Sequence, residues 1–381
     1  MGPLTGVKVV EFAGIGPGPF CCMLLADMGA DVLRIDRAAN VDNDPYEPRF
    51  NTLLRGRKNV AIDLKSAKGV ETALKLCDRA DILIEGFRPG VMERLDLGPE
   101  PVFARNKKIV YGRMTGWGQD GPIAHTPGHD INYIALTGAL YAIGTQANGP
   151  VPPLNLIGDF GGGALYMAMG ALAAYIEAQR TGAGQVVDTS MVEGAASLMT
   201  SAYGGLAAGT FSEDRETNRL DGGCHHYNVY ETSDGEHICI GANEPKFYAV
   251  MLDIVGLGDA ELPEQTDREN WPEMRTKLAA IFKTKTREQW TLLMEQKEIC
   301  YAPVLRMSEA LSHPQNVHRG SFIEVAGVTQ PGPAPKFAHM ASTPPRDPAH
   351  AGEHTTDGLA DWGISKAEIA GLLQSGAAKQ R

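Results

Sequence analysis

The feature that most constrains the fold is a regular alternation of apolar and amphipathic segments over the first 115 residues. The short apolar runs have the length of strands, and the segments between them have helical spacing. The predicted elements are strands at 7–12, 31–35, 82–85 and 109–114, and helices at 20–28 and 64–79. Such alternation is typical of a doubly wound parallel sheet, in which ligands bind at the carboxyl ends of the strands. We therefore expect an α/β protein with a Rossmann-like large domain.

The length of 381 residues and a change of pattern predict a second domain. Two apolar segments flank Asp234-Gly235, which is a hairpin signal, and helical runs follow them. Glycine-rich and proline-rich stretches lie on either side of this region and are typical of linkers. The predicted organisation is a large Rossmann-like domain at 1–203, a linker at 204–225, a smaller α+β domain at 226–325, a linker at 326–350 and a segment at 351–381 that returns to the large domain.

Charge and cysteine content narrow the functional classes. The net charge of −11 argues against general nucleic-acid binding, which needs basic groups to neutralise phosphates. The six cysteines show neither a CxxC pattern nor metal-like spacing, so we expect free thiols in a reducing compartment. We expect no signal peptide at the start of the chain, where the sequence leads directly into a predicted strand, and we expect no run to reach membrane-spanning length. These features predict a cytoplasmic protein without a membrane or nucleic-acid partner.

The turn after the first strand, GIGPGP, matches part of the sequence fingerprint of a dinucleotide-binding site. Gly14, Gly16 and a later Asp36 match that pattern, but Pro17 and Pro19 remove two backbone donors that a pyrophosphate would need. A nicotinamide or flavin cofactor is therefore not expected. The chain also lacks GxxxxGK[ST] and GxSxG, which excludes a P-loop and the nucleophile elbow of a serine hydrolase.

A basic region follows the second predicted strand. Between residues 49 and 68, six basic residues face a single acidic one, Asp63. The basic residues of this region and of the strand before it are Arg34, Arg37, Arg49, Arg55, Arg57, Lys58, Lys65 and Lys68. They form either a solvated face or a cradle for a polyphosphate such as a nucleotide or coenzyme A. A ligand loop is expected after the strand at 82–85, where Phe87 and Arg88 precede a Pro-Gly break.

The central stretch, residues 128–163, carries the candidate chemistry. His129 and Asp130 precede one predicted helix, which ends near Gly138, and Asp159 precedes three glycines that lead into a second. Helix starts leave unpaired N–H groups that can hold an oxyanion. The stretch can therefore supply two proton carriers and one enolate donor. The alternative is structural: Asp159 is then a helix cap, the glycines permit close packing, and His129 is a solvated loop residue.

Two further sets of polar residues remain open. Glu244 stands before Pro245 at a predicted helix start, where it complements the helix dipole or takes part in chemistry. His225 and His226 are expected to be ordinary loop residues, because no further ligand stands at a spacing suited to a metal. No metal site is predicted.

Taken together, the motifs resemble those of the alpha-methylacyl-CoA racemases within the class III (family III) CoA-transferase superfamily. The resemblance spans nearly the whole chain. It rests on the segments PLTGVKVVEFAGIGPGPF, LLADMGADVLRIDR, NVAIDLK, EGFRPGVMERLDLG, GRMTGWGQDGP, GHDINYIALTGAL, GDFGGGALY, NVYETSDGEHICIGANE and APVLRMSEALSHPQ. The stretch between Arg37 and Leu53 is longer than the family pattern.

The resemblance implies a set of site residues and an interlocked homodimer with a shared active site. His129 and Asp159 correspond to the acid and base, Glu244 to a group that supports the histidine, and the backbone N–H of Asp130 to the donor that binds the thioester oxygen. Coenzyme A, as part of the substrate, is implied to contact Ile15, Pro17, Arg37, Lys65, Phe87, Arg88 and Tyr133. No separate cofactor is implied.

The implied reaction is the interconversion of (R)- and (S)-2-methylacyl-CoA thioesters through an enolate, with His129 and Asp159 as the acid-base pair. A base on one face of the carbon removes the proton and an acid on the other face returns one. The main alternative is a CoA-transferase in which Asp159 attacks the thioester to form a covalent acyl-enzyme. A second alternative is a CoA-ester-binding protein without turnover. His129 favours the racemase, since the transferases usually have an aromatic residue there.

Overall fold

The computed structural model describes residues 2–42, 47–339 and 344–381. Residues 43–46 of the long stretch after Arg37 lie outside the described residues, as do residues 340–343 of the predicted linker. The chain divides into two compact units. The first comprises residues 1–137, 154–198 and 319–381, and the second comprises residues 138–153 and 199–318.

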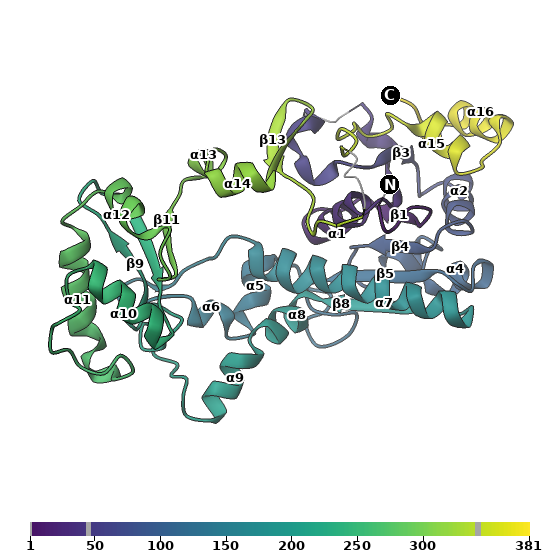
Figure 1. The fold of residues 1–381 in the computed structure, drawn as a ribbon. Helices are drawn as coiled ribbons and strands as arrows, with labels where there is room; N and C mark the ends of the chain where they lie inside the picture. Colours follow the sequence, from purple (N-terminus) through teal and green to yellow (C-terminus); the bar gives the residue numbers. More distant parts are fainter. Residues whose placement is uncertain (1, 43–46, 340–343) are drawn as a thin grey trace. The chain divides into compact units, whose positions relative to one another are not determined.

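A seven-stranded sheet forms the centre of the first unit, with the order β14-β3-β2-β1-β4-β5-β8 (Figure 1). Six of its strands are parallel, and β14 runs antiparallel to β3. The strands are β1 (Lys8–Phe12), β2 (Asp31–Arg37), β3 (Lys58–Ile62), β4 (Ile82–Glu85), β5 (Val110–Thr115), β8 (Val186–Ser190) and β14 (Ala378–Lys379). This parallel-dominated α/β sheet confirms the predicted fold class.

Helices cover both faces of the sheet, as the near-continuous apolar strands require. Alternate residues of β1 enter two separate cores: Val10 and Phe12 pack with α2, α15 and α16, whereas Val9 packs with α1 and α7. The helices of this unit are α1 (Pro17–Asp27), α2 (Ala67–Cys77), α3 (Val91–Arg94), α4 (Pro99–Arg105), α5 (Asp130–Ala135), α7 (Tyr166–Thr181), α8 (Met191–Leu198), α15 (Thr355–Asp361) and α16 (Lys366–Ser375), with short 3₁₀ turns at Ala38–Asn40, Pro48–Phe50 and Thr52–Leu54.

The C-terminal segment 351–381 lies in the large unit, as predicted, but the chain already returns to this unit at residue 319, so the predicted end of the small domain at 325 is too late. Ala378 and Lys379 pair with Ile62 and Ala61, and α15 packs on β3. Figure 1 shows the yellow C-terminal helices beside the purple N-terminal strands. The hairpin β12 (Phe322–Val325) and β13 (Val328–Pro331) also belongs to this unit, where Arg55 donates hydrogen bonds to Gln330 and to the carbonyl of Pro331.

A helical run of 26 residues begins at Leu156 and continues through α7 to Thr181. Its first part, η4 (Leu156–Leu165), is π-helical. By length and composition alone this run could cross a membrane, which differs from the expectation that no run would. The finding is weak evidence, because core helices of soluble proteins pass the same test. Here Met167, Ala171 and Ala178 are fully buried within the first unit.

The second unit has its own sheet and core. Its sheet has the antiparallel order β11-β10-β9, and β9 and β10 form the hairpin predicted around Asp234-Gly235. Its elements are α6 (Ala139–Ala142), β6 (Gly144–Thr145), β7 (Gly149–Pro150), α9 (Thr200–Ala207), β9 (Tyr227–Glu231), β10 (His237–Gly241), α10 (Pro245–Ile254), a 3₁₀ turn (Arg268–Asn270), α11 (Trp271–Phe282), α12 (Arg287–Met294), β11 (Tyr301–Val304), α13 (Met307–Ala310) and, at its edge, α14 (Pro314–Arg319).

Residues 138–153 were assigned to the large domain in the sequence analysis, whereas the structure groups them with the second unit. The reason is a set of hydrogen bonds that the sequence pattern does not reveal. The guanidinium group of Arg215 donates to the carbonyls of Tyr141 (3.0 Å) and Thr145 (3.2 Å), and the backbone N–H of Gln146 donates to Glu216. Residues 199–203 at the end of the predicted large domain also belong to the second unit, because α8 and α9 lie in different units.

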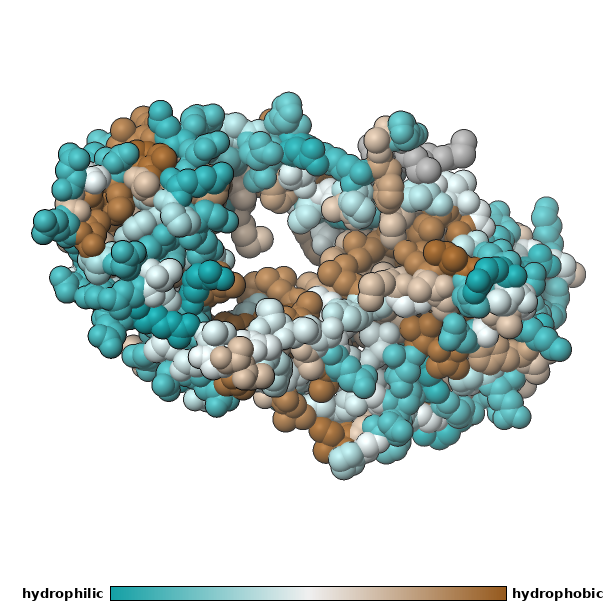
Figure 2. All heavy atoms as spheres, turned by 60° about the horizontal axis from the view of Figure 1, so that its bottom comes forward, coloured by the Kyte–Doolittle hydropathy of each residue, from teal (hydrophilic) through white to brown (hydrophobic). Residues whose placement is uncertain are grey.

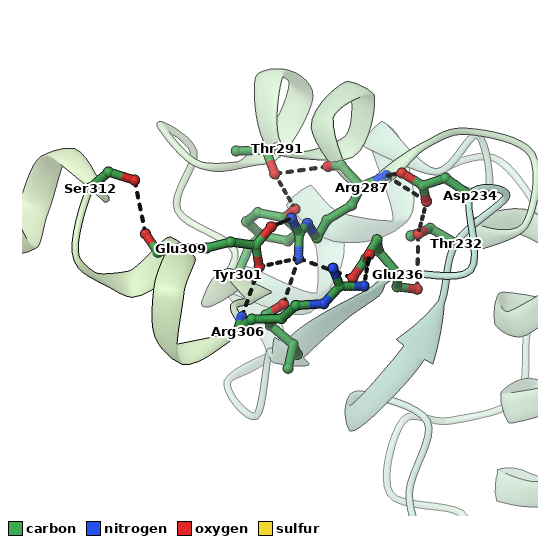
Figure 3. A network of polar contacts seen from close by, with 10 residues as sticks. Thr232, Asp234, Glu236, Arg287, Thr291, Tyr301, Arg306, Glu309 and Ser312 are labelled. Atoms are coloured by element: carbon green, nitrogen blue, oxygen red, sulfur yellow. Dashed lines mark hydrogen bonds and ion pairs between the residues drawn. The ribbon is translucent and has the colours of Figure 1, made fainter.

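Charged side chains connect the elements at one end of this unit (Figure 3). Arg287 binds the carboxylates of Glu236 and Glu309, and Arg306 donates a second bond to Glu236. The bond from Arg287 holds the pKa of Glu309 at about 2. This network links the start of α12 to β10 and α13.

His225 and His226 are buried in the second unit and are not loop residues in contact with solvent. His225 Nε2 lies 2.8 Å from the hydroxyl oxygen of Tyr248, and the ring of His226 contacts Trp271 edge to face. Burial lowers the pKa of both imidazoles to about 4. Both rings are therefore neutral at pH 7 and serve the packing of this unit.

Candidate active site

A cavity of about 540 Å³ opens in the first unit at the carboxyl edge of the sheet. The strand order reverses at β1, which has β2 on one side and β4 on the other. The loops that follow β1 and β4 separate at such a point and leave a crevice for a ligand. The lining comes from the turn at 14–19, the loop at 85–89, the end of β5 and the loop after it at 115–117, the segment 126–129, and Phe12, Leu53, Ile84, Met114, Ala124, Tyr133, Asn155, Asp159 and Met191.

The turn after β1 lies directly against Asp159. Gly16 adopts a left-handed conformation (φ 67°), and a Cβ atom built on it would lie 3.0 Å from Asp159 Oδ2. A residue with a side chain would therefore be strained and would press on the carboxylate. Helix α1 begins at Pro17, and neither Pro17 nor Pro19 has a backbone N–H, so its first turn offers few backbone donors.

His129 is the N-cap residue of α5, at the mouth of the cavity. Its backbone N–H donates to Asn132 Oδ1 (3.0 Å), and its side chain is exposed. The Tyr133 hydroxyl, one turn along, donates to the carbonyl of Gly128, and the Tyr133 ring packs edge to face on Trp117 at 4.8 Å. These contacts hold the backbone on both sides of His129, while the imidazole remains accessible.

Asp159 is half-buried and lies in the first turn of η4, so the sequence-based expectation of a residue ahead of the helix is wrong. The helix runs through Gly161–Gly163 because these glycines pack closely on α8. A Cβ at Gly162 would lie 2.5 Å from the backbone nitrogen of Ala195. The glycines therefore permit a helix crossing rather than a turn.

Two hydrogen bonds fix Asp159. Asn155 Nδ2 donates to Asp159 Oδ2 (3.0 Å), and the backbone N–H of Asp159 donates to Asp130 Oδ2 (2.7 Å). Burial raises the pKa of the Asp159 carboxyl group. The Asn155 bond and the charge of His129 lower this pKa, whereas the charge of Asp130 raises it, and the net direction is upward. His129 and Asp159 thus line one cavity and interact electrostatically, as predicted for the two proton carriers.

The residues predicted to contact coenzyme A are divided between two cavities. Ile15, Pro17, Phe87, Arg88 and Tyr133 line the cavity that contains His129 and Asp159. Arg37 and Lys65 line a second cavity of about 630 Å³, which shares Phe12 and Phe87 with the first. Ile15, Arg37, Lys65 and Arg88 are exposed.

Most of the predicted basic region does not face a ligand. Arg34 and Arg57 are buried and both bind Glu11, at 2.5 Å and 2.7 Å, and Arg55 is buried against Asp27 at 2.6 Å. Lys58 pairs with Asp361. These ion pairs correct the idea of a continuous polyphosphate cradle, because the guanidinium groups are already occupied within the fold.

Glu85 is a cavity residue that the sequence reasoning missed. It is buried at the end of β4, where it accepts hydrogen bonds from the Phe87 N–H (2.8 Å) and from Arg113 Nε (3.1 Å). Burial raises its pKa to about 7, against the opposing effect of these two donors. The signal was present, since an acidic residue that ends an otherwise apolar strand stands where parallel sheets place their ligands.

Glu244 lies in the second unit, at the N-cap position of α10 with Pro245 as the next residue. Its side chain is exposed. Its role beside His129 therefore stays a prediction. Within residues 2–42, 47–339 and 344–381, no group of three His, Cys, Asp or Glu side chains has the arrangement of a metal site.

The sequence model that describes the protein family named CoA-transferase family III matches residues 4–355 of this chain. The chain belongs to this family. Among family III proteins it is similar to alpha-methylacyl-CoA racemase of Mus musculus, with 44% identity over 97% of this chain and 96% of the relative, and to that of Homo sapiens, with 42% identity over 96% and 95%. The crystal structure of a CAIB/BAIF family protein from Brucella suis shares the family III fold, with a TM-score of 0.82 at 23% identity over 95% of this chain and 99% of that one.

Proposed function

We propose that this protein is an isomerase that interconverts (R)- and (S)-2-methylacyl-CoA thioesters. The observation that carries the proposal is that an imidazole and a carboxyl group with a raised pKa line one cavity. Relatives named alpha-methylacyl-CoA racemase at 44% and 42% identity support it. One group removes the proton from the carbon next to the thioester, and the other returns a proton to the opposite face.

The raised pKa of Asp159 supports this exchange of roles. An acid and a base interchange most readily when their pKa values are close, and burial moves the carboxyl pKa toward that of an imidazole. The pair holds one proton at the start and at the end, so its two titrations are coupled. We assign the enolate donor to the Asp130 backbone N–H, because the first residue of a helix has no partner within the helix for its N–H.

We place coenzyme A across the two cavities that meet at Phe12 and Phe87. The thioester end lies beside Gly16 and Asp159, and the nucleotide end lies near Arg37 and Lys65. Lys65→Ala should raise KM for an acyl-CoA about 10-fold with little change in kcat, because it removes one exposed phosphate contact. Steady-state kinetics measures this. Lys68→Ala is the matched control, since Lys68 is also exposed and lines neither cavity, and an equal effect of both variants would contradict the placement.

Incubation with a 2-methylacyl-CoA in D₂O tests the function. A racemase incorporates deuterium at the alpha carbon and produces both epimers. A transferase that uses Asp159 as nucleophile exchanges the acyl group only when an acid acceptor is added, and a binding protein does neither. Absence of alpha-deuterium would overturn the proposal, and mass spectrometry with chiral separation reads out all three cases.

We also propose that the protein is an interlocked homodimer. Leu165, Met169 and Ile176 are 52%, 62% and 68% exposed and follow one another at helical spacing along the run that ends in α7. Patches of apolar surface are also visible on the face shown in Figure 2. Exposed apolar stripes of this kind are typical of interfaces. Sedimentation at about the 40.8 kDa mass of one chain, rather than twice this value, would contradict the dimer.

Glu244 is proposed to support His129 in the assembled enzyme. Glu244→Gln removes the negative charge and keeps the size of the side chain, so we expect kcat to fall about 10-fold with KM nearly unchanged. Denaturant unfolding of the same variant reports any loss of helix stability. An unchanged kcat would leave Glu244 with only the role of complementing the dipole of α10.

A cytoplasmic location and independence from any metal or redox cofactor complete the proposal. All six cysteines are free thiols, which supports a reducing compartment. Cell fractionation tests the location, and activity after exhaustive dialysis against a chelator tests the metal requirement.

A further inference from the structure

The carboxylate of Asp130 connects the two helix starts that carry the proton carriers. Asp130 follows His129 directly in the chain and is the first residue of α5. Its Oδ2 atom accepts a hydrogen bond from the backbone N–H of Asp159 at 2.7 Å, in the first turn of η4. This N–H is one of those that a helix cannot satisfy from within its own start. The bond joins segments 29 residues apart in the chain.

The surroundings of this carboxylate indicate that its position is built into the fold. Asp130 is only 5% exposed, and its Oδ1 atom has no hydrogen-bond partner among the described residues. Burying a carboxylate oxygen without a hydrogen-bond partner costs the desolvation free energy of that atom, which no hydrogen bond offsets. Such a group calls for an explanation beyond stability.

Gly158 provides the space for this contact. A Cβ atom on Gly158 would lie 2.6 Å from Asp130 Oδ2 and 2.9 Å from its Cγ. Real Cβ atoms do not approach oxygen so closely, so any side chain at position 158 would push the carboxylate away. The glycine that precedes Asp159 therefore has a role that its place in the motif does not reveal.

We propose that the side chain of Asp130 is a positioning residue that sets the placement of Asp159 relative to His129. Its carboxylate holds the backbone of Asp159 while its own backbone continues from His129, so the two proton carriers share one rigid link. This inference rests on the proposed racemase function. It assigns a role to the side chain that is separate from the role of the Asp130 backbone N–H.

The same carboxylate also acts on the charge balance of the site. Burial is the largest influence on the pKa of Asp159 and raises it, and the negative charge of Asp130 raises it further. The hydrogen bond from Asn155 and the charge of His129 act in the opposite direction. Burial raises the pKa of Tyr133, whose hydroxyl donates to the carbonyl of Gly128; the charges of Asp159 and Asp130 raise it further, and that of Arg88 lowers it. Removing the Asp130 charge should therefore lower the pKa of Asp159.

The experiment compares Asp130→Asn, Asp130→Ala and Gly158→Ala with the wild type. Two quantities are measured: the pH profile of alpha-proton exchange in D₂O, and the hydrogen-exchange protection of the Asp159 amide by NMR. Asp130→Asn keeps an oxygen that accepts the N–H, so amide protection should remain. The acid limb governed by Asp159 should move to lower pH by about one unit, because a neighbouring like charge has been removed.

Asp130→Ala should lose the amide protection and about 100-fold in kcat, since misplacing a reacting group by about 1 Å has an effect of this size. Gly158→Ala should reproduce both losses although Asp130 is intact, which separates displacement of the carboxylate from its removal. Asp81→Asn is the matched control: Asp81 Oδ2 accepts the Lys8 N–H at 2.8 Å, outside the cavity lining. Its pH profile and its Asp159 protection should equal those of the wild type.

Retained Asp159 protection in Asp130→Ala, or an unmoved acid limb in Asp130→Asn, would overturn the proposal. If the proposed racemase function itself were wrong, the result would be different, because the wild-type protein would then incorporate no alpha-deuterium. The amide protection pattern can be measured without turnover, so the structural link is tested in either case.

Discussion

His129→Ala and Asp159→Ala should each lower the rate of racemisation by at least about 1,000-fold, because inversion needs a proton carrier on each face of the carbon. Exchange of the alpha proton with solvent should continue in part, but each variant should exchange the proton of one enantiomer only. In His129→Ala the remaining carboxylate removes and returns the proton on its own face, so one enantiomer exchanges in D₂O without inversion. In Asp159→Ala the imidazole does the same for the other enantiomer. Chiral separation of deuterated product measures both effects.

His125→Ala is the matched control for this experiment. His125 is exposed in the same loop, and it does not line the cavity. Its racemisation rate should stay within about two-fold of the wild type, since surface substitutions away from a site have small effects. Complete epimerisation by His129→Ala or Asp159→Ala, or exchange of the same enantiomer by both, would contradict the two-base mechanism.

Glu11→Ala should have the largest effect on stability. Glu11 is 1% exposed and its two oxygens bind the buried guanidinium groups of Arg34 (2.5 Å) and Arg57 (2.7 Å). Removing the shared acid leaves the buried Arg57 without a carboxylate partner and leaves Arg34 with Asp36 alone, which should lower the free energy of unfolding of the first unit by about 3–5 kcal/mol. Denaturant unfolding monitored on this unit measures the change.

The same substitution should also disturb the cavity. Arg57 donates to the carbonyl of Pro19 (2.9 Å) and Arg34 to that of Gly14 (3.3 Å), so the two cations hold the turn that lies against Asp159. Glu177→Ala is the control, because its ion pair with Arg180 on α7 is exposed and should contribute at most about 1 kcal/mol. A loss below about 1 kcal/mol in Glu11→Ala would contradict the central role of this acid.

Hydrophobic periodicity was sufficient to predict those helices and strands whose conformation depends on residues close to them in the sequence. The segment ILIE forms β4 at the predicted residues 82–85, and helices such as α11 follow the hairpin as predicted. Periodicity depends on residues a few positions apart, so it can be read before the fold is known. The proton carriers His129 and Asp159 were likewise identified from the motifs around them, and the structure brings them to one cavity.

The features that the sequence did not predict depend on contacts between residues far apart in the chain. Charge counting left Arg34 and Arg57 either on a solvated face or in a polyphosphate cradle. Both instead bind Glu11, which lies 23 and 46 residues before them and reaches them only because β1, β2 and β3 are neighbours in the sheet. The three glycines at 161–163 were expected to lead into a helix, with close packing as the alternative; they lie within the helix η4 and pack closely on α8. Neither partner could be inferred from local spacing.

Sequence alone determined the alternating strands and the parallel α/β class, because these depend on local periodicity, and its motifs predicted His129 and Asp159 as the two proton carriers. Only the tertiary structure decided that Asp130 Oδ2 binds the Asp159 N–H and that the arginines around Glu11 are internal. The physical reason is that a buried polar group must find its partner wherever the sheet order places one, and that order links residues across long stretches of chain.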